Sequence, residues 1–187
     1  MYVRHSLILL VWILFEDKIM NKAYRIFAEY CRQHNICFAE GIDNGFPVLT
    51  IVYKAKRAPM KIIESTIWFY DKGMEVRHYY SEMGSEIVKK ATSLSALYRV
   101  INYVNARVFF SCANPYGLYK PDMLYTPRFY VTEDSCGDIT AATIISNDFF
   151  EVAPIETEEY LTAFCPELLD KMSAPLLMTA AGEWSEE

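Results

Sequence analysis

The sequence predicts an α+β domain in which helices flank a twisted antiparallel sheet. Amphipathic helical patterns occur near the start, the middle and the end of the chain, and strand-like runs lie between them. Turns of hairpin length join these runs, which makes neighbouring strands antiparallel. Because strands and helices come in separate blocks, we expect the order α-β-β-β-α-β-β-β-α.

The first helix follows Met20. Four residues at helical spacing form its apolar face: Ala23, Phe27, Tyr30 and Cys31. Asn35 tolerates the left-handed conformation that often ends helices, so we expect the helix to close there. Ile36–Glu40 is then a short strand candidate.

The first block of strands contains three longer runs rich in β-branched and aromatic residues: Val48–Lys54, Ile62–Tyr70 and Met74–Tyr80. Asp43, Asn44 and Gly45 suit the positive φ of a tight turn before the first of these runs. Ala55–Pro59 and Asp71–Gly73 mark the turns between them. We expect a loop through Gly84 after the block.

The central segment Ser93–Phe110 is an amphipathic helix that leads into a strand. Five apolar residues recur at three- and four-residue intervals and share one helical face: Leu94, Leu97, Tyr98, Ile101 and Val104. Ser93 is suited to be the N-cap, and Asn105 to end the helix. Asn102 and Asn105 are either ligand contacts or a polar helix edge and a C-cap, and residue propensities favour the second interpretation.

The second block contains three shorter strand candidates: Val108–Cys112, Phe129–Thr132 and Ile139–Ser146. A proline-containing loop, 113–127, separates the first two, and the acidic turn Glu133–Asp138 separates the last two. From Glu156 the pattern is helical again. We expect Pro166 and Pro175 to break this helix into short segments, because proline lacks the N–H and clashes with the preceding turn.

Length and composition indicate one globular domain. The chain has 187 residues, of which 52% are hydrophobic, enough for a well-buried core. Its net charge is −6, but residues 151–187 carry −8 and the remainder +2. An acidic end argues against nucleic-acid binding there, since phosphate contacts need clustered Lys and Arg. Five cysteines at irregular spacing argue against a disulfide scaffold and favour reduced thiols in the cytoplasm.

The N-terminal run Leu7–Phe15 is apolar over nine residues. It is too short for a membrane span, which needs about 20 residues, and no small-residue cleavage site of a signal peptide follows it. Either the run is an added element that buries itself on the domain or on a partner, or Met20 is the natural start. We favour the second, and therefore divide the chain into an extension, 1–19, and a single domain, 20–187.

The search for reactive groups predicts no catalytic residue, metal site or cofactor. Cys31, His34 and Cys37 have C-x2-H-x2-C spacing, but a structural zinc site normally needs a fourth ligand, and no second pair follows. Cys136 lies in an acidic turn, which raises rather than lowers a thiol pKa. His78 has no nucleophile motif beside it, and phosphate- or dinucleotide-binding glycine patterns are absent. We therefore expect a protein that is not an enzyme.

Two features are candidates for binding a partner. The run Ile67-Trp68-Phe69-Tyr70 places large apolar side chains on both faces of its strand, so the face away from the helices also needs a cover. That cover is a helix, a ligand or a partner chain.

The second feature is a basic cluster, whose members are Lys54, Lys56, Arg57 and Lys61. It is either a solvated hairpin tip, the more ordinary case, or a contact for an acidic partner, such as the acidic C-terminal helix of another copy.

Three segments resemble the YbjN-type family of bacterial sensory transduction regulators, which are similar in fold to type III secretion chaperones. They are LYRVINYVNARVFF at 97–110, FYVTEDSCGDITAATIIS at 129–146 and EEYLTAFCPELLDKM at 158–172. The resemblance covers about residues 20–180, although the 113–127 loop is longer than in the family pattern. It implies a non-enzymatic protein-interaction module, for which a homodimer is one possible assembly.

We therefore predict a cytoplasmic bacterial module that binds a polypeptide through its sheet or helix surface. The alternative is a small-molecule-binding or enzymatic domain with a pocket between the sheet and the 113–127 loop. Converging His, Asp or Glu side chains with shifted pKa values in a concave pocket would favour the alternative.

Overall fold

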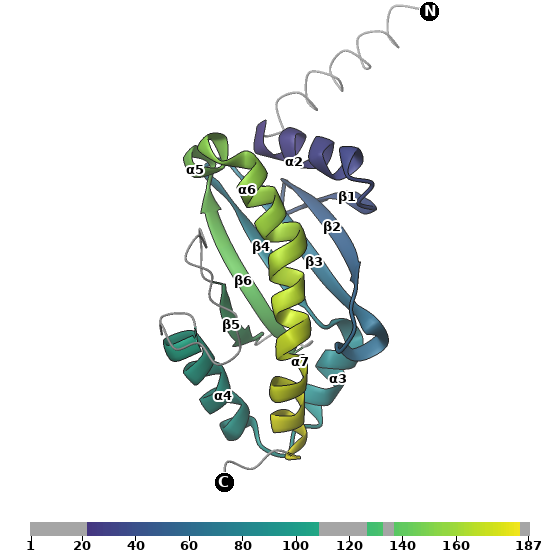
Figure 1. Ribbon diagram of the computed structural model, residues 1–187, viewed down its shortest axis with the longest axis vertical. Coiled ribbons are helices and arrows are strands. Elements are labelled where there is room, and N and C mark those ends of the chain that lie inside the picture. Colours follow the sequence, from purple (N-terminus) through teal and green to yellow (C-terminus); the bar gives the residue numbers. More distant parts are fainter. Residues whose placement is uncertain (1–21, 109–126, 133–136, 184–187) are drawn as a thin grey trace, which may run out of the picture.

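The computed structural model, which describes residues 22–108, 127–132 and 137–183, contains a six-stranded sheet. Every strand pair is antiparallel, and the spatial order is β1-β2-β3-β4-β6-β5. The strands are β1 (Phe38–Asp43), β2 (Phe46–Lys54), β3 (Ile62–Tyr70), β4 (Gly73–Tyr79), β5 (Arg128–Val131) and β6 (Ile139–Ser146). The first four form a meander, whereas β6 returns to pair with β4 and leaves β5 at the edge (Figure 1).

This architecture confirms the predicted α+β class. Four strands rather than three precede the central helices, because the short candidate near Ile36 forms β1. Asn44 and Gly45 have φ of 51° and 85° and make the β1–β2 turn, as predicted. Of the predicted strand Val108–Cys112, Val108 instead ends a π-helical turn, η2 (Val104–Val108), and residues 109–112 lie outside the described residues.

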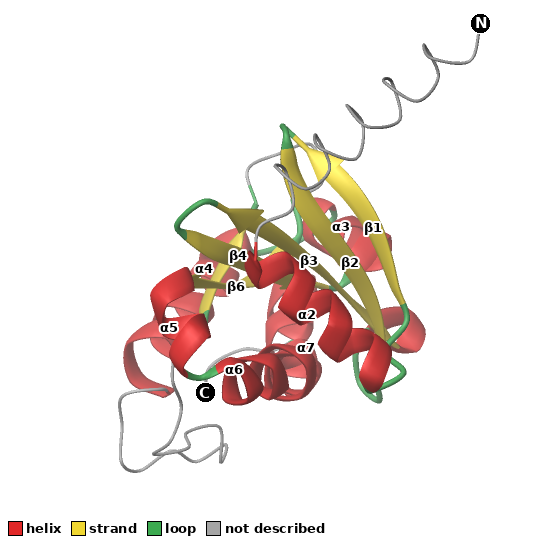
Figure 2. Cartoon of the chain, turned by 90° about the horizontal axis from the view of Figure 1, so that it is seen from above, coloured by secondary structure: helices red, strands yellow, loops and turns green. Residues whose placement is uncertain are grey.

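Helices cover one face of the sheet (Figure 2). They are α2 (Lys22–Gln33), α5 (Asn147–Val152), α6 (Pro154–Glu159), the π-helical turn η3 (Tyr160–Phe164) and α7 (Cys165–Ala181). Leu49, Ile67, Phe69 and Val76 point into this layer and are at most 1% exposed. Alternate strand residues point to opposite faces, so the same strands present a second set of side chains on the other side.

Two further helices, α3 (Ser81–Lys89) and α4 (Leu94–Tyr103), pack against α7 near one end of the sheet (Figure 1). The predicted loop through Gly84 is wrong, since this residue lies inside α3. The start of α4 is as predicted, because the Ser93 hydroxyl accepts a hydrogen bond from the Ala96 N–H at 3.3 Å.

The C-terminal helix is not broken at its prolines, which corrects the prediction. Helical backbone continues from Pro154 to Ala181 through η3. Pro166 lies in the first turn of α7, whereas Pro175 lies inside it. Met172 and Leu176, on either side of Pro175, are buried in the core. Tertiary packing therefore offsets the hydrogen bond that Pro175 cannot donate.

Candidate functional site

The face of the sheet away from the helix layer is the candidate site, and we call it the open face. It consists of alternate residues of five strands: Asp43 on β1; Phe46, Val48, Thr50 and Val52 on β2; Glu64, Thr66, Trp68 and Tyr70 on β3; Glu75, Arg77 and Tyr79 on β4; and Thr140, Ala142 and Ile144 on β6. Most of these side chains are half-buried, and Val52 and Ile144 are 57% and 72% exposed.

A chain of contacts orients the aromatic rings of the open face. Trp68 Nε1 donates a hydrogen bond to Asp43 Oδ2 at 2.8 Å, and the Arg77 guanidinium lies over the Trp68 ring, 4.9 Å from its centroid. Arg77 Nε donates to Glu75 Oε1 at 2.7 Å, and the Tyr70 hydroxyl donates to Glu75 Oε2 at 3.3 Å. These rings are therefore held in place before any partner arrives.

The charge of Arg77 is stabilised where it lies. Partial burial disfavours its charged form, but the hydrogen bond that Arg77 donates to Glu75, together with electrostatic interactions with Tyr130, Glu75 and Tyr70, outweighs burial and raises its pKa. The guanidinium over Trp68 is thus a fixed cation with its own carboxylate partner.

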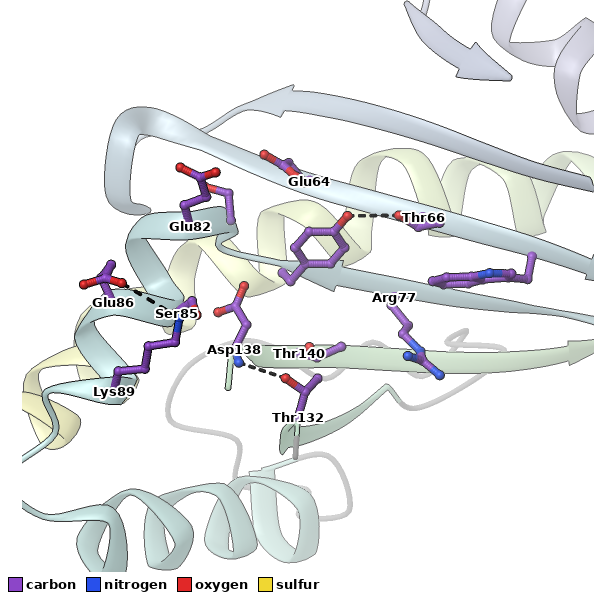
Figure 3. A pocket seen from close by; sticks show the side chains of 13 residues that line it. Glu64, Thr66, Arg77, Glu82, Ser85, Glu86, Lys89, Thr132, Asp138 and Thr140 are labelled. Carbon is purple, nitrogen blue, oxygen red and sulfur yellow. Dashed lines mark hydrogen bonds and ion pairs between the residues drawn. The ribbon is translucent and has the colours of Figure 1, made fainter. Parts of the chain in front are cut away.

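A hollow of about 690 Å³ opens where the open face meets α3 (Figure 3). Strands β3, β4 and β6 contribute Glu64, Thr66, Trp68, Arg77, Tyr79 and Thr140 to its lining, Thr132 and Asp138 come from the ends of the β5–β6 connection, and α3 contributes Ser81, Glu82, Ser85, Glu86 and Lys89. In Figure 3 the α3 side chains lie at one end of the hollow and the strand side chains extend away from them.

The hydrogen bonds within the hollow fix its inner surface. Tyr79 and Thr66 share a hydrogen bond of 3.0 Å between their hydroxyls, and burial raises the pKa of Tyr79. Asp138 is only 6% exposed; its Oδ1 accepts from the Ile139 N–H at 2.7 Å, and its own N–H donates to Thr132 Oγ1 at 2.9 Å. A buried carboxylate therefore forms part of the lining.

The structure divides the predicted apolar run between the two faces. Ile67 and Phe69 lie in the helix layer, each 1% exposed, whereas Trp68 and Tyr70 lie half-buried on the open face. Only the second pair is available for a partner, so the predicted contact surface loses Ile67 and Phe69 to the core.

The predicted basic residues Lys54, Lys56 and Arg57 lie elsewhere. They line a separate groove of about 290 Å³, beside Asp170 and Lys171 of α7. The structure therefore does not bring them together with Trp68 and Tyr70 in one site.

The residues considered for metal binding or catalysis are dispersed. Cys31 is buried, whereas His34 and Cys37 are exposed, and no group of three potential ligands occurs within the described part of the chain. Cys136 lies outside the described residues.

His78 is a core residue. Its Nδ1 is hydrogen-bonded to the Ser65 hydroxyl, and burial lowers its pKa to about 3. The imidazole is therefore neutral near pH 7, and it is buried on the helix-layer side of β4, on the opposite face from Arg77 and Tyr79.

Sequence reasoning missed the α3 side of the hollow. Glu82, Ser85 and Glu86 flank Gly84 in the segment predicted as a loop, but they lie in α3; the signal that could have found this helix is the four-residue spacing of Tyr80, Gly84 and Val88. Gly84 adds no apolar side chain to this spacing, and glycine lowers the helix propensity of the segment.

Comparison of the chain with protein-family models, with curated proteins and with solved structures found no match. Among the helices of the described residues, none is long and apolar enough to cross a membrane.

Proposed function

We propose that this protein is a non-catalytic cytoplasmic module that receives a segment of another polypeptide on the open face of its sheet. The observation that carries the proposal is the set of oriented rings at Trp68 and Tyr70, on the same face of the sheet as the exposed Val52 and Ile144. Trp, Tyr and Arg are the residues most enriched at protein interfaces and their binding hot spots.

Preorganisation supports this function. Asp43, Glu75 and Arg77 hold the two rings through hydrogen bonds and a cation–π contact. Because the rings are already ordered, binding of a partner to them costs little side-chain conformational entropy. The predicted resemblance to YbjN-type regulators leads to the same class of function, and a second copy of the chain is one polypeptide that this face can be tested against.

Fewer observations support the alternative function, which is a small-molecule or enzymatic pocket between the sheet and the 113–127 loop. Residues 113–126 lie outside the described part of the chain. Among the described residues, the lining of the hollow contains carboxylates but no His or Cys, so these residues include no nucleophile activated by an imidazole base. Its carboxylates and hydroxyls are suited to binding.

Site-specific photo-crosslinking tests the proposal. A photoreactive amino acid is placed at Val52 on the open face and, as a matched control, at Val152 of α5, which is 84% exposed on the helix side. In a lysate of the source organism, position 52 should crosslink to a discrete polypeptide, and Trp68→Ala should abolish the crosslink. Position 152 should give none.

Size-exclusion chromatography with light scattering identifies a self-partner. A dimer that Trp68→Ala dissociates would mean that the polypeptide on the open face is a second copy. A strict monomer with no crosslink at position 52 would refute the proposed function.

A further inference from the structure

We propose that the hollow beside α3 binds a lysine or arginine side chain of the polypeptide that occupies the open face. This inference rests on the proposed function and specifies the chemistry of the partner. The hollow is continuous with the open face, since Thr66, Trp68 and Arg77 belong to both.

Charge complementarity is the first argument. Among the described residues, the lining contains four carboxylates, Glu64, Glu82, Glu86 and Asp138, against two cations, Arg77 and Lys89. Both cations already have anionic neighbours, because Arg77 pairs with Glu75 at 2.7 Å and Lys89 lies 3.8 Å from Glu86. The hollow therefore retains an excess of negative charge.

Two of these carboxylates have oxygens that can accept hydrogen bonds from a ligand. Within the described part of the chain, no hydrogen bond or ion pair engages the carboxylate of Glu64 or of Glu82. They reach the hollow from different elements, Glu64 from β3 and Glu82 from α3 (Figure 3). A cation bound in the hollow therefore has both carboxylates in the same lining.

A buried hydroxyl supplies an independent indication of a donor ligand. Ser85 lines the same hollow, is 6% exposed, and its Oγ is buried without a hydrogen-bond partner within the described residues. Buried polar atoms are nearly always paired, so an orphan hydroxyl at a hollow points to a group that arrives from outside. Lysine and arginine side chains carry only donors, which the Ser85 oxygen can accept.

The aromatic lining suits the rest of such a side chain. Trp68 and Tyr79 line the hollow beside the carboxylates. The methylene stem of lysine or arginine packs on apolar surface while its charged end reaches polar groups. Since Arg77 already lies on the Trp68 ring, the incoming cation would pass along Tyr79 towards Glu64 and Glu82.

Selection from a random peptide library displayed on phage provides the test. The full chain is immobilised, and peptides are kept when Trp68→Ala no longer binds them. We expect the kept peptides to share a Lys or Arg. Replacing that residue by norleucine or citrulline, which remove the charge but keep the stem, should weaken binding at least tenfold by titration calorimetry.

Variants of the hollow assign the effect to its residues. Glu64→Gln/Glu82→Gln should weaken the cationic peptide at least tenfold and leave the citrulline or norleucine peptide unchanged. Ser85→Ala, which removes only an unpaired hydroxyl, should also weaken the cationic peptide. Glu159→Gln, an exposed acid on the helix side, should change neither peptide.

Each outcome decides one of the two proposals. Peptides that need Trp68 but show no preference for Lys or Arg would overturn this inference and leave the proposed function standing. A cation preference that survives Glu64→Gln/Glu82→Gln would likewise overturn it. If no peptide depends on Trp68 and position 52 gives no crosslink, both fall together.

Discussion

The side-chain amide of Asn105 forms two hydrogen bonds with the backbone of Phe129. Asn105 Nδ2 donates to the Phe129 carbonyl at 2.8 Å, and the Phe129 N–H donates to Asn105 Oδ1 at 2.9 Å. Phe129 lies in β5, whose other side pairs with β6. The Asn105 side chain thus pairs with the backbone of β5 at the sheet edge, as a neighbouring strand would. The predicted C-cap role of Asn105 is wrong, because this residue lies inside η2.

Asn105→Ala should therefore destabilise the protein. It leaves a backbone donor and acceptor without their partners, which costs about 1–3 kcal/mol. Asn102→Ala on the exposed side of α4 is the matched control and should change stability by less than about 0.5 kcal/mol. Urea unfolding measures both, and equal midpoints for the two variants would show that the amide contributes nothing.

Asp170 connects α7 to the loop between β2 and β3. Its carboxylate accepts from the N–H groups of Arg57 at 2.7 Å and Ala58 at 2.8 Å, and from Lys56 at 3.1 Å. Burial acts to raise the pKa of Asp170, but these three hydrogen bonds outweigh it and lower the pKa. The loop that carries the predicted basic residues is thus fixed by an acid on the C-terminal helix.

Asp170→Ala should cost about 1–3 kcal/mol, since it removes all three backbone contacts. Glu167→Ala, one turn earlier, removes an exposed ion pair to Lys171 and should cost less than about 1 kcal/mol. Hydrogen exchange of the Arg57 and Ala58 amides would localise the effect. Unchanged protection of those amides in Asp170→Ala would contradict it.

The buried His78 should make the protein sensitive to acid. Burial lowers its pKa from the ordinary 6.5 to about 3, so between these values the unfolded chain binds a proton that the folded chain does not. Its contribution to stability is full above pH 6.5 and falls as the pH drops towards 3, by about 2–3 kcal/mol at pH 4.5. His78→Gln should flatten this slope, whereas the exposed His34→Gln should retain it. Urea midpoints between pH 4.5 and 7.5 provide the measurement.

Glu158 should have the opposite pH dependence. It is 3% exposed, and burial raises its pKa from 4.5 to about 7. Between these values the folded state holds a proton that the unfolded state releases, so its contribution to stability falls as the pH rises from 4.5 to 7. Above pH 7 the loss is about 1–3 kcal/mol.

Glu158→Gln mimics the protonated acid and should remove that loss. We expect the variant to be more stable than the native chain at pH 8 and similar to it at pH 4.5. Glu159→Gln, the exposed neighbour, should follow the native chain at both values. A Glu158→Gln variant that is less stable at pH 8 would mean that the buried carboxylate is charged and paired.

The covered face and the turns follow from local sequence. Buried residues alternate along β3 and β4 as period-2 patterning requires, and Asn44-Gly45 and Ser93 have the backbone roles expected of them. The contacts between distant segments do not follow from local sequence. Asn105 meets Phe129, and Gly84 meets Asp138, only because β6 returns to pair with β4 and β5 pairs with β6.

The glycine inside α3 explains why the sequence does not predict this helix. A glycine inside a helix lowers its intrinsic propensity by about 1 kcal/mol relative to alanine, so the local pattern favours a loop. The structure gives this glycine a reason, because a methyl group at Gly84 would lie 2.5 Å from Tyr80 Cβ and 2.7 Å from Asp138 Oδ1. Glycine at position 84 lowers the helix propensity, but it leaves room for the buried Asp138 carboxylate to lie against α3.

Gly84→Ala should therefore destabilise the chain despite the better helix propensity of alanine. Overpacking against Tyr80 and Asp138 costs about 1–3 kcal/mol and exceeds the propensity gain, so we expect a net loss of about 1–2 kcal/mol. Ser85→Ala in the same turn is the control, and it should be neutral or stabilising because its hydroxyl is buried and unpaired within the described residues. Urea unfolding compares the two, and a stabilising Gly84→Ala would show that Asp138 does not lie against α3.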